Sequence, residues 1–329
     1  MQNQALNNEF IEIIKTESAR FALLKTEVAK VVVGNESIID FIIMALLCNG
    51  HILLEGVPGV AKTTIIKAVT QALGLTFRRI QFTPDLLPAD LIGTLIYNPK
   101  TQDFETKKGP IFANLILADE INRAPAKVQS ALLEAMQEQQ VTIGSQTFKL
   151  ETPFFVLATQ NPVEQEGTYP LPEAQIDRFM FKLLVGYLQP SQEREIISKS
   201  THVATITQVL DRESLFQAQK VVEQIYVDPK IVDYIVALVF ATRTPKMYNL
   251  AQLQSYIQYG VSPRATVALY KAAQAHAFLK KRNFVIPDDV KAVAGSIIRH
   301  RITLSYQAQV DGISTDTLVD TILKNVPSL

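Results

Sequence analysis

The stretch Gly56-Val57-Pro58-Gly59-Val60-Ala61-Lys62-Thr63 decides the fold of this chain of 329 residues. It follows a short apolar run at 51–55 and precedes a segment with helical spacing that continues to Ala72. At such a strand-to-helix turn, small residues let backbone N–H groups wrap a phosphate, and the helix N-terminus adds partial positive charge. We expect Lys62 to reach the β- and γ-phosphates and the Thr63 hydroxyl to bind Mg²⁺. The stretch therefore predicts a nucleotide-binding loop.

One position of this loop departs from the usual Walker pattern. Ala61 stands where the common form has glycine. Alanine is acceptable there if the residue already has helical dihedral angles, so we interpret the stretch as a variant phosphate loop. A glycine-rich turn without function is the alternative, and the strand-to-helix context argues against it.

A second apolar run, at 115–118, ends in the acids Asp119 and Glu120. A buried strand that ends in two acids places their carboxylates at the carboxyl edge of a parallel sheet, next to the phosphate loop. We expect Asp119 to hold the Mg²⁺ shell and Glu120 to orient and deprotonate the attacking water. The alternative is that both acids only cap the helix after Asn122, and the presence of Lys62 weakens it.

Two further polar residues fit the same site. Asn161 follows the apolar run 154–159 and is a candidate to position the water or sense the γ-phosphate, with ordinary turn chemistry before Pro162 as the alternative. Arg178 lies at the start of the last expected strand. Its alternative role is a salt bridge with Asp177 or Glu173.

Arg264 breaks a local rule. It occupies the first turn of an expected helix that Ser262 caps and Pro263 begins, where the helix dipole disfavours a cation. Residues that break such rules are candidates for functional sites. An incoming phosphate would explain Arg264, and a salt bridge to another domain is the alternative.

Apolar runs and helical segments alternate through the first 190 residues. Near-continuous apolar strands separated by helices indicate a parallel sheet buried on both faces. We expect its strands at 51–55, 77–82, 115–118, 154–159 and 179–185, and hairpins within 91–112 and 141–148. Beyond residue 190 we expect only helices. The sequence therefore predicts an α/β domain over 1–190 and a helical domain over 191–329.

Composition limits the class of protein. Lys plus Arg and Asp plus Glu each total 32, so the chain lacks the basic excess of a dedicated nucleic-acid binder. One cysteine allows no intrachain disulfide, which agrees with a reducing compartment. The longest apolar run, 41–48, is far shorter than the roughly 20 residues that span a bilayer, and the N-terminus lacks the apolar core of a signal peptide. We expect a cytoplasmic protein without membrane insertion.

Four blocks together resemble the MoxR family of AAA+ ATPases, which is related to the magnesium-chelatase ATPase subunits. They are GVPGVAKT at 56–63, ADEINRAP at 118–125, ATQNP at 158–162 and GVSPRA at 260–265, and the likeness begins at Val33-Gly34. The resemblance implies an AAA+ P-loop NTPase core with a parallel five-stranded sheet and a C-terminal all-helical lid domain. Ala61 is similar to the family's own form.

The resemblance also implies roles for individual residues. Asp119 and Glu120 would be the Walker B pair, Asn161 sensor 1, and Arg264 sensor 2 of the lid. Arg178 would be an arginine finger given to a neighbouring subunit. The two hairpins would be a helix-2 insert and a pre-sensor-1 hairpin. The residues expected to bind ATP are Val33, Gly34, Gly56, Val57, Pro58, Gly59, Val60, Ala61, Lys62, Thr63, Thr64 and Arg264, and those expected to hold Mg²⁺ are Thr63 and Asp119.

The family further implies a hexameric ring and protein partners with von Willebrand A domains, which the ATPase helps to mature or load with metal. We therefore predict an ATP-driven remodelling or chaperone-type enzyme that acts on a protein. One alternative is a nucleic-acid motor of the same fold, supported by Lys100, Lys107 and Lys108 in the first hairpin. The other is a non-hydrolysing nucleotide switch, against which the predicted catalytic residues argue.

Overall fold

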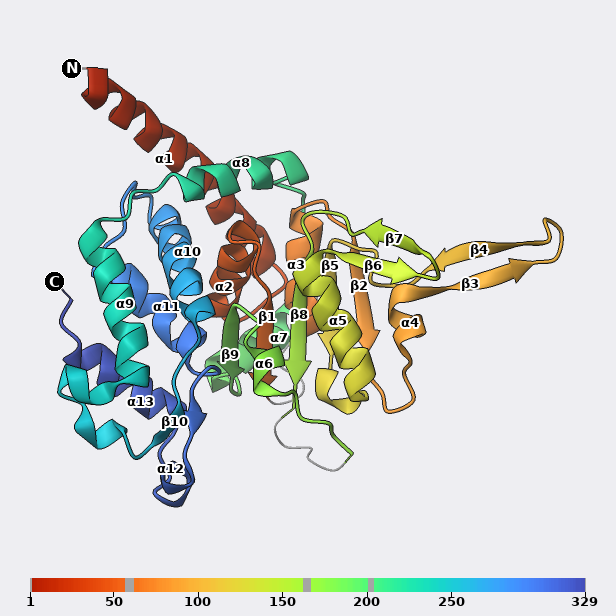
Figure 1. The fold of residues 1–329 in the computed structure, drawn as a ribbon. Coiled ribbons are helices and arrows are strands. Elements are labelled where there is room, and N and C mark those ends of the chain that lie inside the picture. The colour runs from red at the N-terminus through yellow and green to blue at the C-terminus, as the bar shows by residue number, and fades with distance from the viewer. Residues whose placement is uncertain (1, 57–61, 162–166, 201–203, 329) are drawn as a thin grey trace. The chain divides into compact units, whose positions relative to one another are not determined.

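The computed structural model describes residues 2–56, 62–161, 167–200 and 204–328. They form two compact units (Figure 1). The α/β unit comprises Leu23–Phe179 and Leu183–Arg212, and the helical unit comprises Met1–Ala22, Met180–Lys182 and Glu213–Leu329. Because each unit combines separate stretches of chain, the predicted single boundary near residue 190 stays a prediction.

A parallel sheet forms the centre of the α/β unit, as the apolar runs predict. Its five strands lie in the order β2-β5-β8-β1-β9. β8 therefore lies between β5 and β1 and pairs in parallel with both. The strands are β1 (Ile52–Gly56), β2 (Phe77–Gln81), β5 (Leu115–Asp119), β8 (Phe155–Gln160) and β9 (Phe181–Val185).

The central strands are buried on both faces, which explains their continuous apolar sequence. In β5, Leu115, Ile116 and Leu117 are all fully buried although successive side chains point to opposite faces. On one face, Ile116 packs in a cluster with Leu132 of α5 (Ala126–Glu138). The helix α3 (Lys62–Ala72), which follows β1, also contacts β5.

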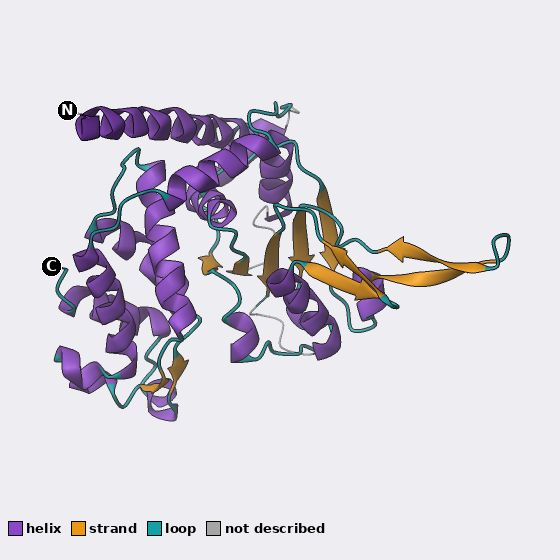
Figure 2. Ribbon diagram, turned by 45° about the horizontal axis from the view of Figure 1, so that its top comes forward, coloured by secondary structure: helices purple, strands orange, loops and turns teal. Residues whose placement is uncertain are grey.

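Two hairpins lie beside the sheet and touch each other (Figure 2). A β-carbon on Gly144, whose φ is +61°, would lie 2.6 Å from Leu95 Cδ1 of the first hairpin. The Nζ of Lys108 lies 4.7 Å from the centre of the Phe112 ring and 5.5 Å from that of Phe148. The hairpins are β3 (Gly93–Asn98) with β4 (Asp103–Lys108), and β6 (Gln140–Ile143) with β7 (Gln146–Lys149).

The other elements described in the first 200 residues are helices. They are α1 (Gln2–Ala29), α2 (Glu36–Leu47), α4 (Pro88–Ile92), the 3₁₀ helix Ile121–Arg123, α6 (Glu173–Ile176) and α7 (Pro190–Ser200). Among the residues that the structure describes, no helix combines the length and apolarity needed to cross a membrane.

A capping residue and a proline begin two helices of the helical unit, as the sequence predicts for Ser262 and Pro263. The side chains of Asp228 and Ser262 accept hydrogen bonds from the first turns of their helices, and a proline opens each. The expectation of helices only beyond residue 190 was wrong in one place, because the short antiparallel pair β10 (Ile257–Tyr259) and β11 (Thr303–Leu304) lies among the helical elements. These are α8 (Arg212–Glu223), α9 (Pro229–Arg243), the 3₁₀ helices Pro245–Tyr248 and Ala251–Leu253, α10 (Pro263–Leu279), α11 (Pro287–Ile298), α12 (Tyr306–Val310) and α13 (Thr315–Asn325).

Candidate active site

Adjacent parallel strands bring the predicted polar residues to one edge of the sheet. β1 ends at Gly56, β5 at Asp119, and β8 one residue before Asn161. Only glycine fits at position 56, because a β-carbon there would lie 2.3 Å from the Val185 carbonyl oxygen of β9. In open α/β sheets, ligands bind outside the carboxyl ends of the strands. The predicted loop residues Val57, Pro58, Gly59, Val60 and Ala61 lie outside the described residues.

Lys62 is the first described residue after the loop and opens α3. Its Nζ donates a hydrogen bond of 2.9 Å to the Gly56 carbonyl oxygen. Burial lowers the pKa of the Lys62 ammonium, while the charges of Asp119 and Glu120 act in the opposite direction. Thr63 and Thr64 follow in the first turn, which contains no acidic residue that would neutralise the positive end of the helix dipole. This corner is suited to an anion.

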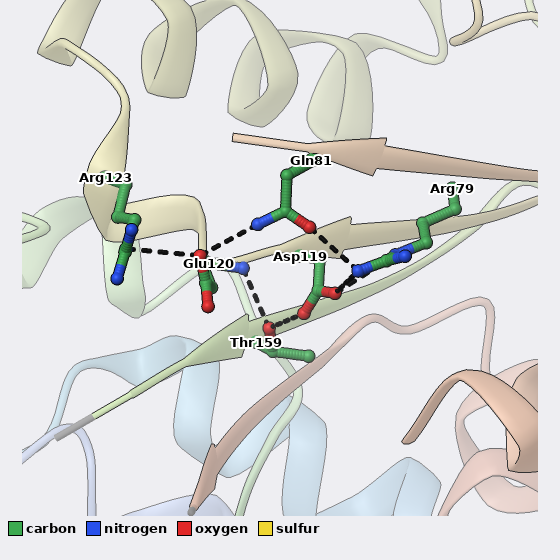
Figure 3. Close-up of polar contacts among 6 residues, drawn as sticks. All are labelled: Arg79, Gln81, Asp119, Glu120, Arg123 and Thr159. Atoms are coloured by element: carbon green, nitrogen blue, oxygen red, sulfur yellow. Dashed lines mark hydrogen bonds and ion pairs between the residues drawn. The ribbon is translucent and has the colours of Figure 1, made fainter. Parts of the chain in front are cut away.

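Asp119 is held from two sides (Figure 3). The Thr159 hydroxyl donates to its Oδ1 at 2.6 Å. From the other side, Arg79 donates to its Oδ2 through Nε at 3.1 Å and Nη2 at 2.7 Å. Both carboxylate oxygens therefore have charge-stabilising partners, and the orientation of the side chain is fixed.

Glu120 has an unusual backbone conformation and several partners. Its φ of 56° and ψ of 49° lie in the left-handed region, which non-glycine residues adopt mainly at strained and functional positions. The Glu120 N–H donates to the Thr159 hydroxyl at 2.9 Å. Its Oε2 accepts from Gln81 Nε2 at 2.8 Å and pairs with Arg123 Nε at 3.1 Å (Figure 3). The Thr159 hydroxyl thus connects both acids.

The oxygen donors at this edge fit Mg²⁺, which prefers carboxylates and hydroxyls and retains several waters. Asp119 supplies the carboxylate at the end of β5 and Thr63 supplies a hydroxyl in the first turn of α3. Both residues are half-buried, so neither is closed off from solvent. These are the residues that we expect to hold the metal.

Two further candidates belong to the same unit. Asn161 is half-buried directly after β8, next to the strand that carries Thr159. Arg178 follows α6, and its Nε donates at 3.0 Å to Gln137 Oε1 at the end of α5. This bond identifies one partner of Arg178, while its predicted role toward a neighbouring subunit stays a prediction.

The other residues that we expect to contact the nucleotide lie on separate segments. Val33 is buried in the turn between α1 and α2, and Gly34 follows with a φ of +69°. A β-carbon at Gly34 would lie 2.8 Å from Nε2 of Gln192 on α7 and 3.0 Å from Cδ2 of Leu188. In the helical unit, Arg264 is exposed in the first turn of α10, with its N–H donated to Ser262 Oγ at 3.2 Å.

Sequence reasoning missed Arg79, Gln81 and Thr159. Arg79 and Gln81 are polar residues at period two on β2, which is a signal that one face of this strand is not buried. Thr159 stood within an apolar strand and gave no separate signal. Their roles depend on which strands are neighbours, and that order is visible only in the structure.

Comparisons with known proteins agree with this geometry. Residues 51–181 match the family described as "ATPase family associated with various cellular activities (AAA)", and residues 251–322 match the AAA lid domain. The chain is 48% identical over 301 residues to the chaperone MoxR1 of Mycobacterium tuberculosis, covering 91% of this chain and 80% of that protein. It is 47% identical over 300 residues to YeaC of Bacillus subtilis, with 90% and 91% covered.

A solved structure shares the fold as well. The crystal structure of a Cytophaga hutchinsonii protein, described only provisionally as an ATPase, superposes with a TM-score of 0.92. The two sequences are 47% identical, and the match covers 99% of each chain. The likeness therefore extends over both units and is not limited to the nucleotide-binding motifs.

Proposed function

The chain belongs to the MoxR-like AAA+ ATPases, and on that premise we propose that it hydrolyses ATP to remodel a protein partner. The observation that carries the hydrolytic part is the position of Glu120. It follows directly on Asp119, and both acids act electrostatically on Lys62 at the start of α3. A base, a metal-binding carboxylate and a phosphate-binding cation thus share one edge of the sheet.

Each residue then has a defined task in phosphoryl transfer. Lys62 and the N-terminus of α3 bind the phosphates, and Asp119 with Thr63 holds Mg²⁺. When bound, Mg²⁺ neutralises charge on the phosphate oxygens. Glu120 orients the attacking water and accepts its proton, and Asn161 is proposed to position that water. These groups act on charge and orientation, which is what phosphoryl transfer requires.

The remaining parts of the site are proposed to come from a neighbouring subunit and from the helical unit. Arg178 would complete the site of a neighbouring subunit in a ring, which we propose is a hexamer. Arg264 would contact the phosphates from the lid. The partner is proposed to be a protein, of which a von Willebrand A domain protein is the candidate, and the setting cytoplasmic. The name of the M. tuberculosis relative, a chaperone, supports the protein partner. Of the three lysines that would favour a nucleic-acid partner, Lys108 lies over the Phe112 ring. Its charge is therefore already in contact with an aromatic side chain of this chain.

Two substitutions test the proposal by separating binding from hydrolysis. Lys62→Ala removes a ligand of the ground-state phosphates, so we expect a fluorescent ATP analogue to lose its binding. Glu120→Gln removes only the base, so binding is retained while phosphate release falls by roughly 10²-fold or more. Lys67→Ala, an exposed lysine of the same helix, is the matched control and should change neither. Near wild-type turnover by Glu120→Gln would reject the assigned base.

A further inference from the structure

Arg79 is a residue to which neither the motifs nor the proposed mechanism assigns a task. It lies on β2, the strand at one end of the sheet order. Gln81 of β2 is the register partner of Asp119 in β5. Because side chains alternate along a strand, Arg79 lies on the same face as Gln81 and reaches Asp119 diagonally. Arg78 points to the opposite face.

The hydrogen bonds to Asp119 nearly fill its acceptor capacity. An ionised carboxylate offers about four lone-pair positions. Arg79 Nε and Nη2 both donate to Oδ2, and the Thr159 hydroxyl donates to Oδ1. About one position is then left for a metal ion or for waters of its shell. A hydrated cation that takes more than this position competes with Arg79 and Thr159 for Asp119.

Of the two partners of Asp119, Arg79 is the one that can leave. The Thr159 side chain is buried and its hydroxyl also accepts from the Glu120 N–H, so its position is fixed twice. The Arg79 side chain is 50% exposed, against 17% for Asp119. When displaced, the guanidinium can be solvated without any rearrangement of the core. Positive charge on Arg79 would also repel an arriving cation.

A second bond of Arg79 extends this arrangement to the catalytic base. Arg79 Nη2 donates to Gln81 Oε1 at 2.9 Å, and Gln81 Nε2 donates to Glu120 Oε2 at 2.8 Å (Figure 3). Only this orientation of the amide satisfies both neighbours, since the guanidinium can only donate and the carboxylate can only accept. Arg79 thus fixes the side chain that holds Glu120.

We propose that Arg79 is a counter-cation of Asp119 and competes with Mg²⁺ for this carboxylate. This inference rests on the proposed ATPase function. Departure of Arg79 also removes its hydrogen bond to Gln81, whereas the ion pair between Glu120 and Arg123 does not depend on Arg79. Arg79 therefore raises the Mg²⁺ concentration that the site requires.

The test is a Mg²⁺ titration of nucleotide binding, which needs no turnover. A fluorescent, non-hydrolysable ATP analogue reports binding while Mg²⁺ is raised from zero, for the wild type and for Arg79→Gln, Arg79→Lys and Arg78→Gln. Loss of a bifurcated charge-assisted contact at a half-exposed site predicts a roughly 3- to 10-fold lower half-saturating Mg²⁺ concentration in Arg79→Gln. Arg79→Lys, which keeps the charge but loses the fork, should fall between that variant and the wild type.

Arg78→Gln is the matched control, because it removes the same charge from the adjacent position on the opposite face of β2. Its half-saturating Mg²⁺ concentration should equal that of the wild type. An unchanged or higher Mg²⁺ requirement in Arg79→Gln, with nucleotide binding intact, overturns the inference, and so does an equal fall in Arg78→Gln. A wild-type protein that binds no nucleotide at any Mg²⁺ concentration contradicts the proposed function instead.

Discussion

Lowering the pH from 7 to 5 should destabilise the α/β unit through one buried histidine, His51, which directly precedes β1. The Val156 N–H donates to its Nδ1 at 3.1 Å, and its Nε2 lies 3.3 Å from the Met136 carbonyl oxygen. Because a backbone N–H can only donate, Nδ1 has to be the acceptor and Nε2 has to carry the hydrogen. A second proton on Nδ1 would point at the Val156 N–H. His51 therefore links β1, β8 and α5 only in its neutral form.

The size of the effect follows from the pKa of His51. Burial lowers this pKa from 6.5 to about 4, with the Met136 carbonyl acting in the opposite direction. Between these values the unfolded chain binds a proton that the folded chain does not. The stabilising contribution of neutral His51 is therefore complete above about pH 6.5 and is lost as the pH falls toward about 4. Between pH 7 and pH 5 the loss is roughly 2 kcal/mol.

The assay is urea denaturation of the nucleotide-free protein at both pH values, followed by circular dichroism. His51→Asn is the control variant, because an asparagine Oδ1 can still accept the Val156 N–H but does not titrate. Other groups titrate equally in both proteins, so the comparison isolates His51. We expect the wild type to lose roughly 2 kcal/mol more than the variant on acidification. Equal losses in the two proteins would refute the assigned tautomer and burial effect.

Two further predictions concern Arg264, which lies in the helical unit, and Arg178, which is proposed to act on a neighbouring subunit. Arg264→Ala should weaken ATP binding and change the thermal stability of the protein without nucleotide only slightly. The reason is that this exposed arginine lies at the end of the helix where the dipole disfavours a cation. A large loss of thermal stability with unchanged ATP affinity would show that Arg264 has a structural role. Arg178→Ala and Glu120→Gln should each be nearly inactive, and mixing them should recover activity, because a mixed interface can pair an intact Arg178 with an intact Glu120. No recovery in proven mixed rings would leave Arg178 with its local partner Gln137.

The sheet could be predicted because its strands are buried on both faces and therefore consist of continuous apolar runs. The predicted ends of the strands and helices were less accurate. The last strand, expected at 179–185, begins at Phe181, because Phe179 and Met180 are buried in the segment before it and have the same apolar signal. The first helix begins at Gln2, in a polar stretch that carries no apolar period and so gives no helical signal.

Some residues of the candidate site could be predicted from a local sequence pattern, and others could not. Lys62, Asp119 and Glu120 could be assigned from sequence because each lies at the end or start of an element, so a local pattern fixes its place. Arg79 and Thr159 could not, because their contacts with Asp119 depend on β2 and β8 being the two neighbours of β5. Strand order is a property of the whole sheet, and about 40 residues of chain separate each partner from Asp119. The motifs therefore identify the groups that we propose act on ATP, whereas the non-local pairing of strands determines the contacts that hold those groups in place.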